Sequence, residues 1–408
     1  MEGPAQVTQP VPATLPDLTY TEQESDLRAA VRSVLEERAS WPEVLARTET
    51  AQTYDTGLWQ VLAARIGCAG LLVPESLGGA GASFREAAVV AEEIGRALAP
   101  VPFLGSAVIA TSALLAVAGT DGPAQVAGLL SGLADGNVTA VLAVGFTEMP
   151  GSVPPPQVRV AGSDGDVYRL TGTVAGVADA LPADVLIVPA DGVPYGLYAV
   201  RADAAGVRRT AVTSLDMTRQ LADLRLDEAP ATRIAAGPAA QRAVAEALAA
   251  GAGVLAAEQL GLADRALEIT LAYVKQRYQF ARPVGSFQAV KHRLADLWVA
   301  LTQARAAARY AAACLATGDP DSAVAVALAK AACSDTALLA GQEMVQLHGG
   351  IGFTWEHPAH LYLKRAKADS IALGTADRHR AALVGLVNLP APGDSASIHR
   401  RIGWLSGP

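Results

Sequence analysis

The sequence has few cysteines, no long apolar run and no excess of positive charge. Its three cysteines, Cys68, Cys314 and Cys333, are scattered through 408 residues without metal-ligand spacing. We therefore expect no metal site and a reducing, cytoplasmic location. No uninterrupted apolar run reaches the roughly 18 residues that span a bilayer, so we expect no membrane span. Residues 1–6 lack the basic and apolar regions of a signal peptide, so we expect no signal peptide there. The net charge of −8 argues against nucleic acid as a partner.

Three stretches of the chain differ in residue pattern. From 18 to 135, apolar residues recur at helical spacing, beginning with a predicted capping box of Thr21 and Glu24. From 136 to 233, short β-rich runs alternate with Gly, Pro and Asp clusters, which is typical of strands and turns. From 238 to 388, long alanine-rich helical patterns return. We expect helical, β and helical domains with these bounds.

Both ends of the chain have a different composition. Residues 1–17 contain four prolines and are predicted to form a disordered leader. Residues 389–408 are rich in Pro, Gly and Ser and are predicted to form a tail. There is no internal repeat or low-complexity tract. Long C-terminal helices beside an inserted β domain favour a cofactor cleft at the domain junction.

Several motifs follow one another in a fixed order along the chain. They are Val73–Gly81 with Glu92–Gly95, Leu215–Arg219, Arg277–Asp296, Gln346–Phe353 and Lys364–Thr375. Together they resemble the acyl-CoA dehydrogenase family over about residues 19–388. The resemblance implies an α+β multidomain fold with an N-terminal helical domain, a central β-barrel-like domain and a C-terminal four-helix bundle. It also implies FAD as cofactor and a dimer or tetramer, and some actinobacterial members form α2β2 heterotetramers.

The resemblance also implies which residues contact FAD. Arg277 presents a fixed fork of donors that suits phosphate oxygens. Gly349 and Gly350 lack a Cβ, so a cofactor can approach their backbone. By residue type alone, Arg277 could equally form a surface ion pair, and the glycine pair could simply end a helix. His348, just before the pair, is predicted to be a structural imidazole. The other predicted FAD residues are Gln279, Phe280, Gln288, Gln346, Thr375 and Thr147.

Leu373 stands where the family resemblance implies a catalytic glutamate. Dehydrogenation at Cα–Cβ needs a base for the α-proton, and losing such a base costs on the order of 10²–10⁴ in rate. Some family members carry the glutamate on the preceding helix, at the place of Gly251 or Ala252 here. The nearest carboxylates are Glu246 and Glu258. Glu258, two helical turns from position 251, is the candidate base. We nevertheless favour a hydrogen-bonding or subunit-contact role for Glu258 over the catalytic one.

The segments that resemble the flavin-ring side of the family depart further from its pattern. Thr147 is the one fair match in the Phe146–Ser152 segment. Gly176–Ala180 replaces the aromatic and hydroxyl residues that cover the ring. Asp377 stands where glutamine is common, and an anion facing a pyrophosphate is unfavourable. The adenine and pyrophosphate side is thus kept better than the ring side.

These observations leave three functions open. The first is an FAD-dependent dehydrogenase for an acyl-CoA or acyl-carrier thioester, in lipid or polyketide metabolism, with electron-transfer flavoprotein as electron acceptor. The second is a partner subunit without chemistry of its own, which contributes part of the FAD site to a heteromeric tetramer. The third is other flavin chemistry, such as a biosynthetic desaturase or an oxidase. The sequence does not identify the acyl group.

Overall fold

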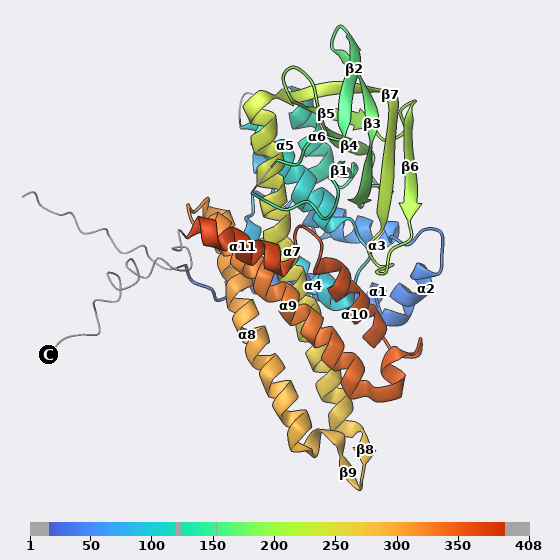
Figure 1. Ribbon diagram of the computed structural model, residues 1–408, viewed down its shortest axis with the longest axis vertical. Coiled ribbons are helices and arrows are strands. Elements are labelled where there is room, and N and C mark those ends of the chain that lie inside the picture. The colour runs from blue at the N-terminus through green and yellow to red at the C-terminus, as the bar shows by residue number, and fades with distance from the viewer. Residues whose placement is uncertain (1–15, 120–123, 152, 388–408) are drawn as a thin grey trace, which may run out of the picture.

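The computed structural model describes residues 16–119, 124–151 and 153–387 (Figure 1). Most of the predicted leader and all of the predicted tail therefore lie outside the described residues. The described part has the predicted order of a helical part, a β part and a second helical part. The predicted fold class is confirmed in that order, and the elements below give its detail.

The N-terminal part consists of short and medium helices. The capping box predicted at Thr21 is present, because the Glu24 amide donates to Thr21 Oγ1 at 3.1 Å and the Glu24 carboxylate accepts from the Thr21 amide at 2.7 Å. The η4 segment is wound as a π-helix that continues directly into α5. The main helices here are α1 (Glu22–Arg38), α2 (Trp41–Thr48), α3 (Thr56–Gln60), α4 (Phe84–Ala97), η4 (Phe103–Ala110), α5 (Thr111–Ala118) and α6 (Ala124–Ala134).

The central part is a seven-stranded sheet that curls toward closure. Its order is β1-β4-β5-β7-β3-β2, with β6 paired to β7. Beyond the end of β4, Asp191 exchanges backbone hydrogen bonds with β2, to Val158 at 2.8 Å and from Val160 at 2.9 Å. These bonds join the edge strand β2 to the segment that follows β4, near the other edge of the sheet, which gives the barrel-like form. The strands are β1 (Ala140–Leu142), β2 (Val158–Asp164), β3 (Val167–Ala178), β4 (Val185–Ala190), β5 (Gly196–Arg201), β6 (Val207–Val212) and β7 (Leu221–Ala236).

Within the described residues the C-terminal helical part has three long α-helices, and two short α-helices stand in place of the fourth long helix of the predicted bundle. The long helices are α7 (Gly237–Gln276), α8 (Gln288–Thr317) and α9 (Ser322–His348). The short helices α10 (Ala359–Asp369) and α11 (Ala376–Leu386) both pack against α9. The last helical segment is divided because Gly349 ends α9 at φ +61° and Gly374, at φ +97°, separates α10 from α11.

Helix α7 connects the two ends of the molecule (Figure 1). Its 40 residues begin beside the sheet and end at the small hairpin of β8 (Tyr278–Gln279) and β9 (Arg282–Pro283). Two helical segments, Gly237–Gln276 and Ser322–Phe353, are long and apolar enough to cross a membrane by composition. In the protein, 83% and 61% of their apolar windows are buried, so they are core helices of the fold.

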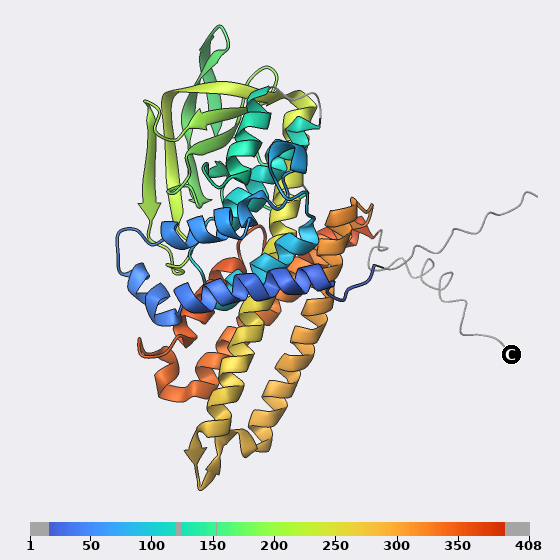
Figure 2. The same cartoon turned by 180° about the vertical axis from the view of Figure 1, so that it is seen from behind.

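Helices α4 and α7 cross with their backbones in contact at two glycines. A Cβ on Gly95 would lie 2.0 Å from the carbonyl oxygen of Glu258, and a Cβ on Gly261 would lie 1.8 Å from that of Glu92. Only glycine permits such a close approach at both positions. Figure 2 shows α1 and α4 lying across the long C-terminal helices. The Glu92–Gly95 motif thus has a packing role at this crossing.

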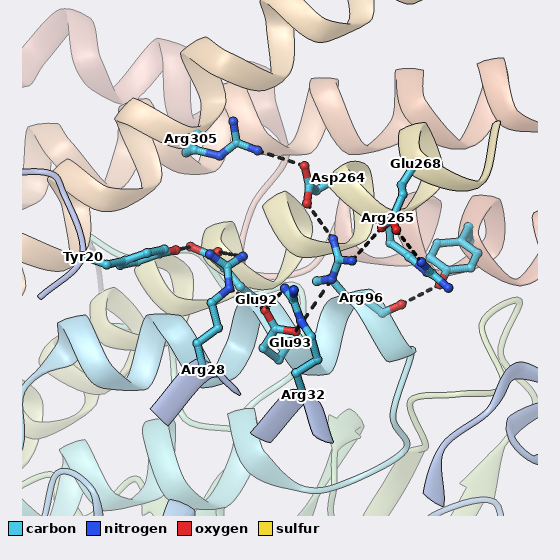
Figure 3. Close-up of polar contacts among 11 residues, drawn as sticks. Tyr20, Arg28, Arg32, Glu92, Glu93, Arg96, Asp264, Arg265, Glu268 and Arg305 are labelled. Atoms are coloured by element: carbon cyan, nitrogen blue, oxygen red, sulfur yellow. Dashed lines mark hydrogen bonds and ion pairs between the residues drawn. The ribbon is translucent and has the colours of Figure 1, made fainter. Parts of the chain in front are cut away.

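A network of ion pairs surrounds the same crossing (Figure 3). Arg28 of α1 donates to both Glu92 and Glu93 of α4, at 3.1 and 2.7 Å. Arg96 of α4 donates to Asp264 and Glu268 of α7, at 2.6 and 2.7 Å. Burial would raise the pKa of Glu93, but hydrogen bonds from arginines of α1 outweigh it and lower that pKa. The network therefore holds α1, α4 and α7 in one arrangement.

Candidate active site

The predicted cofactor residues lie in two groups far apart in the folded chain. Seven belong to the end formed by the α7–α8 hairpin and the end of α9. The second group, Thr147 and Thr375, lies around Leu373 beside the β part. Lys330 of α9 places its Nζ 3.4 Å from the Gly374 carbonyl oxygen of the second group. Gly349 follows Lys330 by 19 residues, about 28 Å at 1.5 Å per helical residue. The first group comprises Arg277, Gln279, Phe280, Gln288, Gln346, Gly349 and Gly350.

The first group is exposed and open, and we call it the hairpin end. Arg277 follows the last residue of α7, and its guanidinium forms no ion pair within the described part of the chain. The side chain of Phe280 is 88% exposed at the tip of the hairpin. A Cβ on Gly349 or Gly350 would meet no atom within 4 Å. The hairpin end thus offers the unpaired guanidinium of Arg277 and the exposed backbone of Gly349 and Gly350. Within the described residues, no other segment of the chain faces these groups.

His348, which precedes the glycine pair, is buried under the hairpin end. Its ring stacks on Tyr273 at 4.3 Å between centroids and tilts against His357 at 4.2 Å. His348 Nδ1 donates to the Met344 carbonyl oxygen at 2.6 Å. Burial lowers the pKa of His348, so the neutral ring is favoured. These contacts support the structural role predicted for this imidazole.

The second group is tightly packed around Leu373. Leu373 is buried at φ +51°, and its amide donates to the Phe146 carbonyl oxygen at 2.7 Å. A Cβ on the next residue, Gly374, would lie 3.0 Å from Met149 Cγ. Thr375 caps helix α11, and its hydroxyl accepts from the Arg378 amide at 3.4 Å. Thr147 is exposed beside this contact. At this point the 146–149 segment touches the 373–374 turn directly.

Gly251 lies against Leu373. A Cβ on Gly251 would be 3.2 Å from Leu373 Cδ1 and 2.7 Å from Ile109 Cγ1. The two positions at which the family resemblance implies a base are therefore neighbours. In this chain position 373 carries leucine and position 251 has no side chain, and Ile109 of η4 packs against Gly251.

The Gly176–Ala180 segment, which stands where family members cover the flavin ring, packs against η4. Asp179 is buried at φ +58°, and its Oδ2 accepts from the Gly105 amide of η4 at 3.1 Å. Burial raises the pKa of Asp179, although the charge of Arg219 opposes that shift. This contact fixes the segment to η4. Asp377, the other departure, is exposed and pairs with Arg380 at 3.0 Å.

Glu258 lies in a buried cluster of ion pairs rather than beside Leu373. Its Oε1 accepts from Arg219 Nη2 at 2.5 Å and from Arg365 Nη2 at 2.7 Å. Burial would raise the pKa of Glu258, but the charges of the two arginines outweigh it and lower that pKa to about 2. A carboxylate with so low a pKa is a weak proton acceptor. These contacts favour the structural role for Glu258 over the catalytic one.

The charge of this cluster is completed by Asp369 and Lys330. Asp369 lies 3.5 Å from Arg365, and neither of its carboxylate oxygens has a hydrogen-bond donor within the described residues. Burial, and next the charge of Glu258, raise the pKa of Asp369 to about 7. Burial lowers the pKa of Lys330 to about 8, while its Nζ donates to the Asp369 carbonyl oxygen at 2.9 Å. The cluster joins the Leu215–Arg219 motif to α7, α9 and α10.

A cavity of about 1020 Å³ opens between α5, α7, α9, α11 and the Met149–Gly151 segment. Its lining is mostly alanine, leucine, proline and glycine, and contains no lysine or arginine among the described residues. The polar members include Ser112 and His379, which sequence reasoning did not identify. No spacing pattern marks them, because they come from different helices. Glu258 is not part of the wall, whereas Glu246 is.

The fold and these sites define a class of oxidoreductase, with two helical parts around a β part. The comparisons with known proteins agree. The family model described as "Acyl-CoA dehydrogenase, N-terminal domain" matches residues 21–137, and "Acyl-CoA dehydrogenase, C-terminal domain" matches residues 241–384. The chain belongs to the acyl-CoA dehydrogenase family, whose members bind FAD and act on CH–CH bonds.

Relatives and solved structures cover nearly the whole chain. Acyl-CoA dehydrogenase IpdE2 of Mycobacterium tuberculosis is 36% identical over 349 residues, covering 86% of this chain and 92% of that protein. A chain of the ChsE4-ChsE5 complex from Mycobacterium tuberculosis superposes with a TM-score of 0.81 at 30% identity, covering 92% and 100%. A variant of the Tcur3481-Tcur3483 steroid ACAD superposes with a TM-score of 0.78 at 33% identity, covering 90% and 98%.

Proposed function

We propose that this chain is the base-lacking, FAD-contributing subunit of a heteromeric acyl-CoA dehydrogenase. One observation carries the proposal: Gly251 lies against both Leu373 and Ile109. Both positions implied for the α-proton base are filled by apolar groups. The candidate acid Glu258 is held by two arginines, so the proposal takes the catalytic carboxylate from another chain.

The hairpin end has the properties that a shared cofactor site requires. Arg277 has donors free for phosphate, and the surface over Gly349 and Gly350 is open. These residues fit the nucleotide half of FAD, with Gln279, Phe280, Gln288 and Gln346 around them. FAD, when bound, would supply the acceptor for the substrate hydride. This chain's own residues would bind and orient the cofactor and would take no proton from the substrate.

The separation of the two groups supports a site built from two chains. The hairpin end and the Leu373 turn are about 28 Å apart along α9, and the hairpin end has no opposing wall of its own. A partner of the same family would supply the flavin-ring half and the base. In this chain, the segments that would hold the flavin ring contain Thr147 and Thr375. There the turn at Leu373 and Gly374 packs directly against Phe146 and Met149. Two solved relatives, the Tcur3481-Tcur3483 steroid ACAD and the ChsE4-ChsE5 complex, are each named for two different chains.

The rest of the assignment follows the family. The substrate is an acyl thioester on CoA or a carrier protein, and electron-transfer flavoprotein is the electron acceptor. The assembly is a tetramer with two kinds of chain. The protein is cytoplasmic, consistent with three cysteines that are all free and buried in the described structure.

Co-expression with a related chain that keeps the Glu-Gly-Thr sequence tests the proposal. The present chain alone is expected to purify without stoichiometric flavin and without activity toward acyl-CoA. The co-purified pair is expected to be yellow and to reduce a dye with acyl-CoA as substrate. A yellow, active homo-oligomer of this chain alone would sink the proposal.

Arg277→Ala in the co-purified pair tests the hairpin end directly. Charge-assisted hydrogen bonds contribute about 1.5–3 kcal/mol, so FAD should dissociate roughly 10- to 100-fold more readily. Arg208→Ala is the matched control, because Arg208 is an exposed arginine of β6 that forms no ion pair within the described residues. Equal FAD retention in both variants would remove Arg277 from the site.

A further inference from the structure

A second cavity, of about 510 Å³, opens over the α4–α7 crossing, and all of its lining residues in the described part of the chain are charged. Four are arginines and two are acids, so the lining has an excess of positive charge in a chain whose net charge is −8. We call this cavity the arginine pocket. Its residues come from four helices: Arg28 and Arg32 of α1, Arg96 of α4, Asp264 and Glu268 of α7, and Arg305 of α8.

Three of these arginines keep N–H donors that are not used within the protein. Arg28 and Arg32 each donate from Nε and Nη2 to carboxylates of α4, and Arg305 donates from Nη2 to Asp264. Within the described residues, Nη1 of each of the three forms no hydrogen bond. The side chains of Arg28, Arg32 and Arg305 are 24%, 37% and 32% exposed, so these donors are accessible but partly shielded. Free guanidinium donors of this kind suit phosphate oxygens.

The two acids of the lining are already occupied by arginines. Asp264 accepts from Arg96 at Oδ2, at 2.6 Å, and from Arg305 at Oδ1, at 2.9 Å. Glu268 pairs with Arg96 at 2.7 Å and with Arg265 at 3.0 Å. Because each carboxylate oxygen has a cationic partner, these acids repel an approaching anion only weakly.

Two further acids lie behind the arginines, inside the protein. Glu92 and Glu93 of α4 are 3% and 2% exposed. Arg28 donates to both, and Arg32 donates twice to Glu93, at 2.7 and 2.8 Å. These buried carboxylates fix the two guanidinium groups from the interior side. A ligand that binds from solvent therefore meets donors that are already ordered, which reduces the entropy lost on binding.

The lining also restricts the class of ligand. It has no apolar side chain, so an acyl or aromatic group would find no apolar wall there. The volume of about 510 Å³ is within the roughly 300–1,000 Å³ usual for small-molecule sites, and one phosphate ion would not fill it. Figure 3 shows Arg305 on one side of the crossing and Arg28 and Arg32 on the other. An anion with two phosphate groups can contact both sides at once.

We propose that the arginine pocket binds a small anion with two or more phosphate groups, through the free N–H groups of Arg28, Arg32 and Arg305. The bound anion would link α1 to α8 across the α4–α7 crossing and so stabilise the packing of the two helical parts. The pocket shares no residue with the hairpin end or with the turn at Leu373. The inference therefore goes beyond the proposed function and does not depend on it.

Isothermal titration calorimetry with pyrophosphate tests the proposal. The full-length chain is used, with its partner when the two co-purify, in metal-free buffer held at constant ionic strength with sodium chloride. Pyrophosphate is expected to bind about tenfold more tightly than orthophosphate, because its second phosphate group accepts further charge-assisted hydrogen bonds. Equal affinity for the two anions, or no measurable binding of pyrophosphate, would overturn the proposal.

Four variants locate the binding. Arg305→Gln and Arg32→Gln each remove one guanidinium of the pocket and should weaken pyrophosphate binding about tenfold. Arg305→Gln leaves Asp264 paired with Arg96, and circular dichroism verifies the folding of each variant. Arg38→Gln, at an exposed position of α1 outside the pocket, is the matched control and should bind normally.

Arg277→Ala distinguishes the arginine pocket from the hairpin end, whose free arginine could also attract phosphate. This variant should bind pyrophosphate as the unaltered protein does. Weak binding in Arg277→Ala, together with normal binding in Arg305→Gln and Arg32→Gln, would place pyrophosphate at the hairpin end and contradict the assignment.

Discussion

The side chain of Leu373 packs against the backbone of Gly251, and a Cβ on Gly251 would lie 3.2 Å from Leu373 Cδ1. The family resemblance implies that these are the two places from which a base can reach the substrate α-proton. Their contact shows that both would serve one point in space. In this chain Gly251 lies against Leu373 and Ile109, and the Leu373 amide donates to the Phe146 carbonyl oxygen. Under the proposed function, the base is therefore replaced by apolar packing around Gly251 as well as by the single residue Leu373.

Leu373→Glu is expected not to create a dehydrogenase in the isolated chain. The new carboxylate would enter an apolar wall, where burial raises its pKa and costs several kcal/mol of stability if it ionises. Anaerobic flavin reduction by acyl-CoA is the measurement, with Leu373→Gln as the uncharged control of similar size. Activity at least tenfold above that control would show that the site lacked only its base.

Gly95→Ala and Gly261→Ala are each expected to destabilise the protein by about 3 kcal/mol or more, because a methyl group would overlap backbone oxygen at the α4–α7 crossing. Gly128→Ala is the control. Gly128 lies in α6 with nothing within 4 Å of a new Cβ, so alanine should stabilise that helix by about 0.5–1 kcal/mol. Denaturant unfolding measures all three. Equal stability of the Gly95 and Gly128 variants would contradict the crossing.

Glu258→Gln is expected mainly to lower the free energy of unfolding. It removes the charge that pairs with Arg219 and Arg365, and breaking a buried pair typically costs about 3–5 kcal/mol. Glu246→Gln, at an exposed position of the same helix, should change stability by less than about 0.5 kcal/mol. Thermal unfolding distinguishes them. A Glu258→Gln variant with normal stability and lost turnover in the complex would restore the catalytic interpretation.

Acidification from pH 6.5 to pH 4 is expected to lower the unfolding free energy. Burial lowers the pKa of His357, His360 and His379 to about 4 each, from 6.5 in the unfolded chain. Between these values the unfolded state binds more protons, so stability that is complete above pH 6.5 is lost as pH falls. Burial also lowers the pKa of His348, which acts in the same direction. The buried acids Asp369, Asp179 and Glu92 have raised pKa values, so they act in the opposite direction and reduce the loss.

The melting temperature as a function of pH checks this expectation. His360→Phe keeps an aromatic ring against Trp355, whose ring centroid lies 4.6 Å away, and removes one of the titrating histidines. Its melting temperature should therefore fall less steeply between pH 6.5 and 4 than that of the unaltered protein. A parallel slope in the two proteins would exclude His360 from the acid response.

Much of the fold could be predicted because it depends on local pattern. The Thr21–Glu24 capping box and the helix stop at Gly349 are set by residues within one turn of each other. The closing of the sheet through Asp191 could not be predicted, since it pairs segments about 30 residues apart and leaves no periodic signal. The division of the last helix at Gly374 also escaped, because that glycine appeared only as part of a motif.

The candidate site was harder to predict, because the direction of each side chain decides which residues contact one another there. Glu258 shares an α7 face with position 251 by spacing alone, yet Arg219 and Arg365 hold its carboxylate in the ion-pair cluster. Ser112 and His379 come together only after α5 and α11 have packed around one cavity. The hairpin end, by contrast, is formed by two continuous motifs, Arg277–Asp296 and Gln346–Phe353, so its residues could be grouped from the sequence, and the FAD contact of Arg277 stays a prediction.

The length of helix α7 bears on the number of flavins that the proposed complex holds. Gly251 lies in the first half of α7 and Arg277 just past its end, so under the proposed function each chain presents one ring half and one nucleotide half that cannot meet each other. Two like chains paired about a twofold axis would complete two sites. If only the partner has a working ring half, a pair of unlike chains completes one, and the purified tetramer should hold two flavins for four chains.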